Sequence, residues 1–284
     1  MKVGAIVQTR MSSSRLPGKV LLPLPLESKT DSVLSQVIRR LKRSIKIDSI
    51  IIATTTDGED DQIIQEAEKH KVLSYRGSKL NVLERTYKAA SSYQLDLVVR
   101  VTSDCPCIDP QLIDKGIAEH LEHDADFSTT ALQRTLPYGL DFEIMTFSTL
   151  EKAYLNSTLD FEKEHVTPYI YKSKPDKFKI HRIICDGSLP TIRITLDTIE
   201  DYTLISAVYD LIDETNFKLR DLVLLFEKHP WLAKINKGVE QKKVLSGITE
   251  ELDEVSKYCK KQDLHRFKDY LDKYRKEIIN TNLD

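Results

Sequence analysis

Short apolar runs alternate with stretches of helical periodicity through the first half of the chain. The runs carry almost no charge and are rich in β-branched residues, which is typical of buried strands in a parallel sheet. They lie at residues 3–7, 49–53, 72–76 and 97–101. The spacing of apolar residues between them predicts helices over residues 32–41, 60–70, 82–93 and 110–120. This alternation predicts an α/β fold with crossover connections and a mostly parallel sheet.

The second half of the chain mixes strand and helix patterns without regular alternation. Strands are predicted over residues 126–131, 141–145, 178–185 and 192–195, and helices over 149–154, 162–171, 199–212 and 219–227. From about residue 248 the pattern is helical and highly charged, which predicts a helical hairpin packed on the core or on a partner subunit. We therefore expect a main domain over residues 1–233 and a tail over 234–284, with a hinge at 234–243.

Composition narrows the class of protein. The 284 residues are 40% hydrophobic and 30% charged, and 42 basic residues nearly balance 44 acidic ones, which argues against a nucleic-acid-binding protein. Because no apolar run approaches the ~20 residues that span a bilayer, we expect no membrane insertion and a cytoplasmic location. The four cysteines match no zinc pattern, so reduced thiols are expected.

A loop with three positive residues follows the first strand. It reads QTRMSSSRLPGK over residues 8–19 and carries Arg10, Arg15 and Lys19. Residues 1–43 hold nine basic residues against two acidic ones. A cationic loop of small residues after a first strand is typical of anion binding in open α/β sheets, and a phosphate chain is the predicted ligand. It is neither a Walker A loop nor a dinucleotide fingerprint, because the required glycines are missing.

Two aspartates are candidates for holding the divalent cation that accompanies a triphosphate. Asp104 follows the strand at 97–101, at the sheet edge expected for the cationic loop, although it could simply begin a turn before Pro106. Asp197 lies in the segment RITLDTIED, where it or Thr198 could instead cap the next helix. Carboxylates completed by phosphate oxygens and water form the shell that Mg²⁺ prefers.

A further group of polar residues suits a polyhydroxylated ligand. The segments PYGLDFE and EHVTPY, at residues 137–143 and 164–169, combine a glycine, carboxylates, tyrosines and a histidine. A surface pair of His165 with Glu164 is the alternative interpretation. The chain contains no G-x-S-x-G or H-E-x-x-H motif, so a hydrolase with a serine nucleophile or a zinc protease lacks support.

The ordered set of motifs resembles the sugar-acid cytidylyltransferase family, whose members make CMP-activated 3-deoxy-manno-octulosonate and acylneuraminate. The motifs are QTRMSSSRLPGK, TSDCP, PYGLDFE, EHVTPYI and TLDTIEDY, within about residues 1–230. Among its branches, that of spore coat polysaccharide biosynthesis protein F is the most similar. The resemblance implies a three-layer α/β/α fold of the nucleotide-diphospho-sugar transferase type, with a mixed, mostly parallel sheet. The C-terminal helical tail lies outside it.

The resemblance also implies roles for particular residues. The implied catalytic residues are Arg15, Lys19, Asp104 and Asp197, of which Asp104 and Asp197 would hold Mg²⁺. Nucleotide contacts are implied for Arg10, Ser13, Arg15, Lys19, Ser78, Arg85 and Thr102. Acceptor contacts are implied for Tyr138, Asp141, Glu143 and His165. Arg100 is a further candidate for binding substrate, in place of a glutamine that reads the base in other members. The expected partners are CTP and a sugar or sugar-acid acceptor, with CMP transferred and pyrophosphate released for surface polysaccharide or glycoconjugate synthesis.

This chain departs from the better-studied members at one informative place. Thr102 and Ser103 stand where those members carry a glutamine, which helps to read the base, and a glycine. Two alternatives therefore stay open at this point: a glycosyltransferase or a nucleotidyltransferase for another base on the same fold, and an inactive assembly subunit that docks through its charged tail. The tail could also join two chains in a homodimer.

Overall fold

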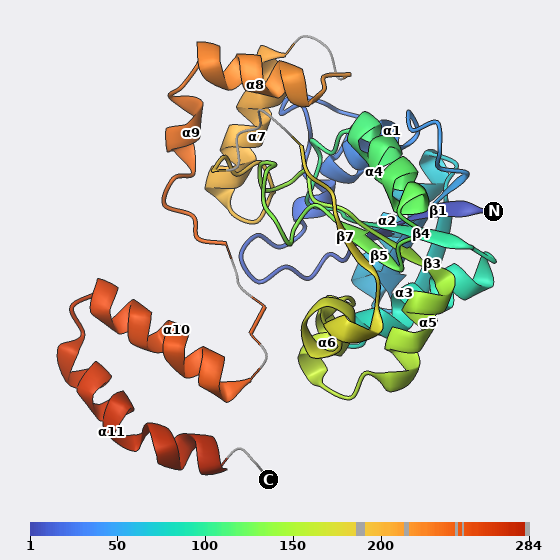
Figure 1. The fold of residues 1–284 in the computed structure, drawn as a ribbon. Coiled ribbons are helices and arrows are strands. Elements are labelled where there is room, and N and C mark those ends of the chain that lie inside the picture. The colour runs from blue at the N-terminus through green and yellow to red at the C-terminus, as the bar shows by residue number, and fades with distance from the viewer. Residues whose placement is uncertain (186–190, 213–215, 242–243, 246, 282–284) are drawn as a thin grey trace. The chain divides into compact units, whose positions relative to one another are not determined.

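The chain folds into two compact units, Met1–Glu240 and Gln241–Asp284 (Figure 1). The computed structural model describes residues 1–185, 191–212, 216–241, 244–245 and 247–281. The larger unit extends past the predicted limit at residue 233 and includes a short helix, α9 (Leu232–Ile235), that the sequence pattern did not predict.

A seven-stranded mixed sheet forms the middle layer of the larger unit. β1 pairs in parallel with both β2 and β4, whereas β6 runs antiparallel to β4 and β5. The predicted mixed, mostly parallel sheet is therefore confirmed. In sheet order the strands are β3 (Leu73–Gly77), β2 (Ser49–Thr55), β1 (Val3–Gln8), β4 (Leu97–Thr102), β6 (Glu143–Thr146), β5 (Phe127–Thr129) and β7 (Ile180–Arg182).

Helices cover both faces of this sheet, because successive residues of a buried strand point to opposite faces. Ala5 and Val7 of β1 pack in a hydrophobic cluster with residues of α1, α2 and α4, whereas Ile6 packs with residues of α3 and α5. The result is the predicted three-layer α/β/α fold (Figure 1). These helices are α1 (Val33–Leu41), α2 (Asp61–Lys69), α3 (Val82–Ser92), α4 (Pro110–Glu122) and α5 (Phe147–Asn156).

A third hydrophobic cluster fixes the segment that carries Asp197. It contains residues of α7 (Ile199–Leu211), α8 (Leu219–Lys228) and α9, and it includes Ile194 and Leu196. The backbone N–H of Leu196 also donates to the carbonyl oxygen of Asp104, at 2.8 Å. The segment before α7 is thereby joined directly to the residues that follow β4.

The strand predicted over residues 192–195 is wrong. Only an isolated bridge joins Arg193 to Tyr138 there. Gly139, which follows Tyr138, has a φ of 105°, and a Cβ atom on it would lie 2.5 Å from the carbonyl carbon of Ile194. The two backbones therefore pair over a single parallel bridge and lie so close beside it that only glycine fits at position 139.

The helix predicted over residues 162–171 is interrupted. α6 (Asp160–His165) ends at Val166, whose φ is 75°, and a π-helical turn, η3, follows at Tyr169–Ser173. Pro168 explains the break, because a proline has no N–H to donate and disfavours helical backbone in the residue before it. The strand predicted over 178–185 is shorter than expected and forms β7 alone.

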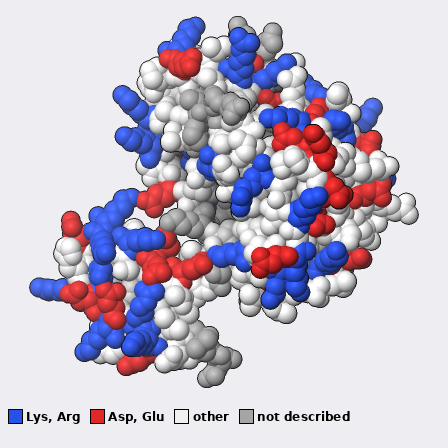
Figure 2. Space-filling view, viewed as in Figure 1, with Lys and Arg blue, Asp and Glu red and all other residues white. Residues whose placement is uncertain are grey.

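The smaller unit contains the predicted C-terminal helices, α10 (Ile248–Lys261) and α11 (His265–Thr281). The two pack against each other and bury Leu252, Cys259 and Leu271, and Arg275 pairs with Asp253 at 2.6 Å. Basic and acidic side chains are interspersed over the visible face of this unit (Figure 2). The predicted hinge lies partly outside the described residues. Within the described part of the chain, no helix is long and apolar enough to span a bilayer.

Candidate active site

The carboxyl ends of β1 and β4 place the candidate residues at one edge of the sheet. Gln8, the last residue of β1, lies in register with Thr102, the last residue of β4. The cationic loop leaves β1 at this edge, and Asp104 follows β4 there. Open α/β sheets bind ligands at the carboxyl ends of their strands, so this edge is the expected place for a site.

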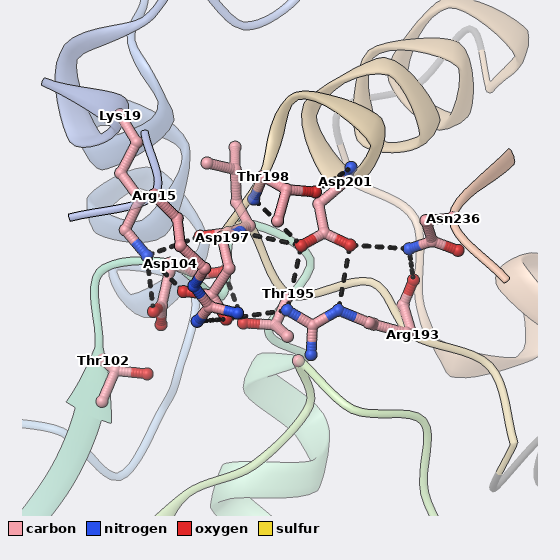
Figure 3. Close-up of polar contacts among 12 residues, drawn as sticks. Arg15, Lys19, Thr102, Asp104, Arg193, Thr195, Asp197, Thr198, Asp201 and Asn236 are labelled. Atoms are coloured by element: carbon pink, nitrogen blue, oxygen red, sulfur yellow. Dashed lines mark hydrogen bonds and ion pairs between the residues drawn. The ribbon is translucent and has the colours of Figure 1, made fainter. Parts of the chain in front are cut away.

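Lys19 connects two carboxylates that are distant in sequence (Figure 3). Its Nζ atom lies 3.0 Å from Oδ2 of Asp104 and 2.8 Å from Oδ1 of Asp197, and it donates to the carbonyl oxygen of Leu196 at 2.6 Å. These contacts use all three ammonium protons. The structure thus brings Asp104 and Asp197, which we call the carboxylate pair, together around one cation.

Three positively charged side chains contact the carboxylate of Asp197. Its Oδ2 atom lies 2.8 Å from Nη2 of Arg15 and 2.7 Å from Nη2 of Arg193. Burial alone would raise the pKa of Asp197, but Lys19, Arg193 and Arg15 outweigh it and lower the pKa to about 2. Burial likewise opposes the charged form of Lys19, yet attraction to the carboxylate pair raises its pKa above the ordinary value. Asp197 and Lys19 are therefore ionised at neutral pH.

The donor atoms of the carboxylate pair fit a magnesium ion. Carboxylate oxygens are hard ligands, and Mg²⁺ in nucleotide sites is commonly held by one or two carboxylates while phosphate oxygens and water complete its shell. Among the residues that the structure describes, no cluster of three or more His, Cys, Asp or Glu side chains is arranged to hold a metal ion. Two carboxylates are within the number of protein ligands that such a magnesium site commonly has.

Three residues that support the site, Arg193, Asp201 and Asn236, were not predicted to belong to it. Arg193 pairs with both Asp197 and the buried carboxylate of Asp201, and the side-chain amide of Asn236 donates to Asp201 at 2.8 Å (Figure 3). The only signal for Asp201 was its place in the first turn of a helix, which an ordinary capping residue explains equally well. Asn236 lies in a segment that was expected to be a hinge.

Asp60 anchors the cationic loop, and the sequence analysis missed it as well. Its buried carboxylate accepts hydrogen bonds from the N–H of Met11 at 2.8 Å, the hydroxyl of Thr54 at 2.8 Å, and both the N–H and the hydroxyl of Thr55, at 3.0 and 2.5 Å. Burial alone would raise the pKa of Asp60, but these hydrogen bonds lower it below the ordinary value. The loop is therefore tied to the end of β2.

Replacing Asp60 by alanine should lower the free energy of unfolding at pH 7 by about 3 kcal/mol, because buried donors lose their acceptor. Since the folded-state pKa is lowered, the stabilisation is complete above the unfolded pKa of about 3.9 and disappears as the pH falls through the folded-state value. Urea unfolding at neutral and acidic pH measures both effects. As a control, Asp61→Ala removes a largely exposed carboxylate and should cost less than about 1 kcal/mol.

The residues predicted to contact the nucleotide lie along this sheet edge but differ in exposure. Arg10 is exposed and Ser13 is half-buried. Arg85 is buried, burial lowers its pKa to about 10, and its Nη1 donates to the carbonyl oxygen of Ser78 at 2.8 Å. The hydroxyl of Thr102 lies 3.3 Å from the Cys105 sulfur. Arg85 is thus placed to support the Ser78 turn, whereas the Arg10 side chain is exposed to solvent.

The residues predicted to contact the acceptor form two paired groups. Arg100 contacts Oε2 of Glu143 at 2.5 Å and Oε1 of Gln8 at 2.7 Å, and the hydroxyl of Thr167 donates to Glu143 at 2.7 Å. His165 lies near this group, and burial lowers its pKa. Both charges of the Arg100–Glu143 pair are thus compensated within the protein.

In the second group, the carboxylate of Asp141 pairs with Arg134 at 3.0 Å, and the Arg134 guanidinium lies 3.6 Å above the Tyr138 ring. Burial raises the pKa of Asp141, and Arg134 partly offsets this effect. The N–H of Gly139 also donates to Asp141, at 3.3 Å. Asp141 therefore holds the turn around Gly139, and Tyr138 presents its ring to Arg134.

Cys105, next to Asp104, is a structural residue. All four cysteines are free and buried, and burial raises the pKa of the Cys105 thiol well above its ordinary value. A buried thiol of high pKa is a poor nucleophile.

A family model and two relatives each match most of the chain. A family model described as cytidylyltransferase matches residues 4–252. An uncharacterised protein of Methanocaldococcus jannaschii is 37% identical over 244 residues, covering 85% of this chain and 97% of the relative. A spore coat polysaccharide biosynthesis protein of Bacillus subtilis is 30% identical over 229 residues, covering 79% and 94%.

A solved structure shows the same fold. A cytidylyltransferase from Leptospira borgpetersenii is 33% identical and superposes with a TM-score of 0.78, covering 86% of this chain and 99% of that one. The match supports the architecture on which the carboxylate pair and the cationic loop are placed.

Proposed function

The chain belongs to the cytidylyltransferase family and is a nucleotidyltransferase, and on that premise we propose that it transfers CMP from CTP to a hydroxyl group of a sugar or sugar acid. Pyrophosphate leaves in this reaction. The observation that carries the proposal is the convergence of Arg15 and Lys19 on the carboxylate pair at the carboxyl ends of β1 and β4.

Positioning and charge compensation account for the proposed chemistry. The acceptor hydroxyl attacks the α-phosphorus in line, the new P–O bond forms, and the bond to pyrophosphate breaks. Lys19 and Arg15 bind the phosphates and stabilise the charge that develops on the departing pyrophosphate, while Arg10 and Ser13 add contacts from the same loop. Such preorganised cations act strongly because the site is partly shielded from water.

Asp104 and Asp197 hold Mg²⁺ in this proposal. When bound, the ion polarises the phosphate and lowers the pKa of the attacking hydroxyl. Lys19 contacts both carboxylates in the free protein, so its move toward the phosphates of an arriving nucleotide leaves the carboxylate pair with less positive charge beside it. Nucleotide and metal ion therefore bind together.

The acceptor is a sugar or sugar acid used for surface polysaccharide or glycoconjugate synthesis. The name of the Bacillus subtilis relative, a spore coat polysaccharide biosynthesis protein, supports this assignment. Arg100 in β4 is paired with Glu143 in β6, and His165 lies near both. These three residues and Tyr138 contact the acceptor in this proposal. Ser78 and Thr102, supported by Arg85, contact the nucleotide.

We also propose that the smaller unit joins two chains in a homodimer. Its helices leave Val255, Tyr258, Phe267 and Tyr270 at least 39% exposed, and a second copy of the unit would cover these apolar side chains. Light scattering of the full chain measures its mass, and a monomer would contradict this part of the proposal. The cytoplasmic location stays a prediction.

Thermal unfolding with CTP, UTP, GTP and ATP, each with and without Mg²⁺, tests the nucleotide half of the proposal. A ligand at ~100 times its dissociation constant adds about 2.7 kcal/mol to the native state. We expect a Mg²⁺-dependent shift with CTP and none with the other three nucleotides. Shifts with nucleotide sugars but with no triphosphate would instead support a glycosyltransferase, and no shift with any nucleotide would support an assembly subunit.

A further inference from the structure

We propose that Asp201 and Asn236 are positioning residues for the metal-binding carboxylate of Asp197, and that they act through Arg193. This inference rests on the proposed function, because it concerns how Asp197 is prepared to hold the metal ion. Neither residue touches Asp104 or Lys19, and each is connected to Asp197 by the hydrogen bonds described below.

Asp201 is a buried carboxylate with an unusually complete set of donors. Its side chain is 0% exposed. Nε and Nη2 of Arg193 donate to its two oxygens, both at 2.9 Å, and the backbone N–H groups of Asp197 and Thr198 donate at 2.9 and 3.2 Å. Capping of α7 explains the contact with Thr198. Capping does not explain the two hydrogen bonds from the Arg193 guanidinium to Asp201, or the hydrogen bond from the backbone N–H of Asp197.

The guanidinium group of Arg193 contacts two carboxylates, those of Asp197 and Asp201. Its Nη2 lies 2.7 Å from Oδ2 of Asp197 and 2.9 Å from Oδ2 of Asp201. Asp201 thus compensates most of the Arg193 charge and leaves Asp197 with negative charge for a metal ion. Without the Asp201 charge, more of the Arg193 positive charge would act on Asp197 in a poorly hydrated site, and the metal ion would compete with it.

Asn236 fixes this arrangement from the other side. It lies just past α9, and its side chain is almost fully buried. Its Nδ2 donates to Oδ1 of Asp201 at 2.8 Å and to the backbone carbonyl of Arg193 at 2.9 Å (Figure 3). The side-chain amide of Asn236 therefore binds the Asp201 carboxylate, which orients the Arg193 guanidinium. The same amide also binds the backbone carbonyl of Arg193. Outer residues of this kind commonly tune metal affinity through the ligands that they orient.

Asn236→Ala provides the primary test. Mn²⁺ binding is measured by electron paramagnetic resonance with a non-hydrolysable CTP analogue present, alongside the KM for CTP, kcat and the melting temperature. We expect the Mn²⁺ affinity to fall by about tenfold, with a smaller change in the KM for CTP. Asp201→Asn, which keeps the size of the side chain and removes its charge, should weaken Mn²⁺ binding at least as much.

Thr146→Ala is the matched control for loss of stability alone. The Thr146 hydroxyl caps α5 by accepting from the N–H of Thr149, and Thr146 pairs with Leu97 at the opposite end of β4 from the site. The Thr146→Ala substitution should lower the melting temperature and leave the Mn²⁺ affinity unchanged.

Two results separate failure of this inference from failure of the proposed function. If Asn236→Ala melts at a lower temperature but binds Mn²⁺ as the wild type does, the network is structural only and the inference is overturned. This comparison tests the inference even if the Asp201→Asn variant does not fold. If the wild type itself binds no Mn²⁺ with the CTP analogue, the proposed function fails before any variant is compared.

Discussion

Replacing Asp104 by asparagine should reduce the rate of CMP transfer by about 10³-fold at saturating CTP and Mg²⁺. The substitution removes one of the two proposed metal-binding carboxylates and one of the two negative charges that hold Lys19, at 3.0 Å. The protein should remain folded, because asparagine keeps the shape of the side chain and the carbonyl oxygen of residue 104 still accepts from Leu196 and Thr195. Release of pyrophosphate, followed in a coupled assay, measures the rate.

Asp124→Asn is the matched control for this variant. The Asp124 side chain is 100% exposed, and its only described ion pair is a 3.8 Å contact with Lys179. The same chemical change at this position should leave the rate within about twofold of the wild type, as expected for a surface substitution. An Asp104→Asn enzyme that retains a tenth or more of the wild-type rate would contradict the assignment of Asp104 as a metal ligand.

Replacing Lys19 by methionine should have two effects of opposite sign. Turnover should fall by about 10²–10³-fold, because the departing pyrophosphate loses a cation. Binding of Mn²⁺ in the absence of nucleotide should become stronger, on the order of tenfold, because the ammonium group no longer compensates the carboxylate pair. Electron paramagnetic resonance of free Mn²⁺ measures the second effect independently of activity.

Lys29→Met is the control. Lys29 is an exposed residue of a neighbouring loop, and its replacement changes the net charge of the protein by the same amount. Neither turnover nor Mn²⁺ binding should change in this variant. If Lys19→Met binds Mn²⁺ no better than the wild type does, Lys19 does not compete with the metal ion, and the proposed joint binding of nucleotide and metal would have to be abandoned.

The sheet and one edge of the site follow from local patterns. The apolar runs that form β1, β2 and β4 were visible in the sequence, and carboxyl ends of parallel strands meet at one edge. The cationic loop and Asp104 therefore had to lie near each other. Asp197 could be added only through the family resemblance, because its own segment reads equally well as a helix cap.

The supporting residues could not be predicted, because their partners are distant in sequence. Asp60 precedes α2 and looks like a capping residue, yet it accepts from the N–H of Met11, 49 residues away. Asn236 lies in a charged segment with no pattern of its own and bonds to Asp201, 35 residues away. The predicted strand over 192–195 failed for the same reason, since the single parallel bridge found there joins Arg193 to Tyr138, which is distant in sequence.

The long sequence separation within the site also has a consequence for protein synthesis. The contact between Lys19 and Asp197 joins residues 178 positions apart, and Asn236 completes its surroundings still later in the chain. A ribosome makes the chain from its N-terminus, and the sheet strands up to β7 emerge before Asp197 does. A nascent chain can thus assemble its central layer while Lys19 still lacks one of its two carboxylates, and a product truncated before residue 197 would carry the cationic loop without a complete site.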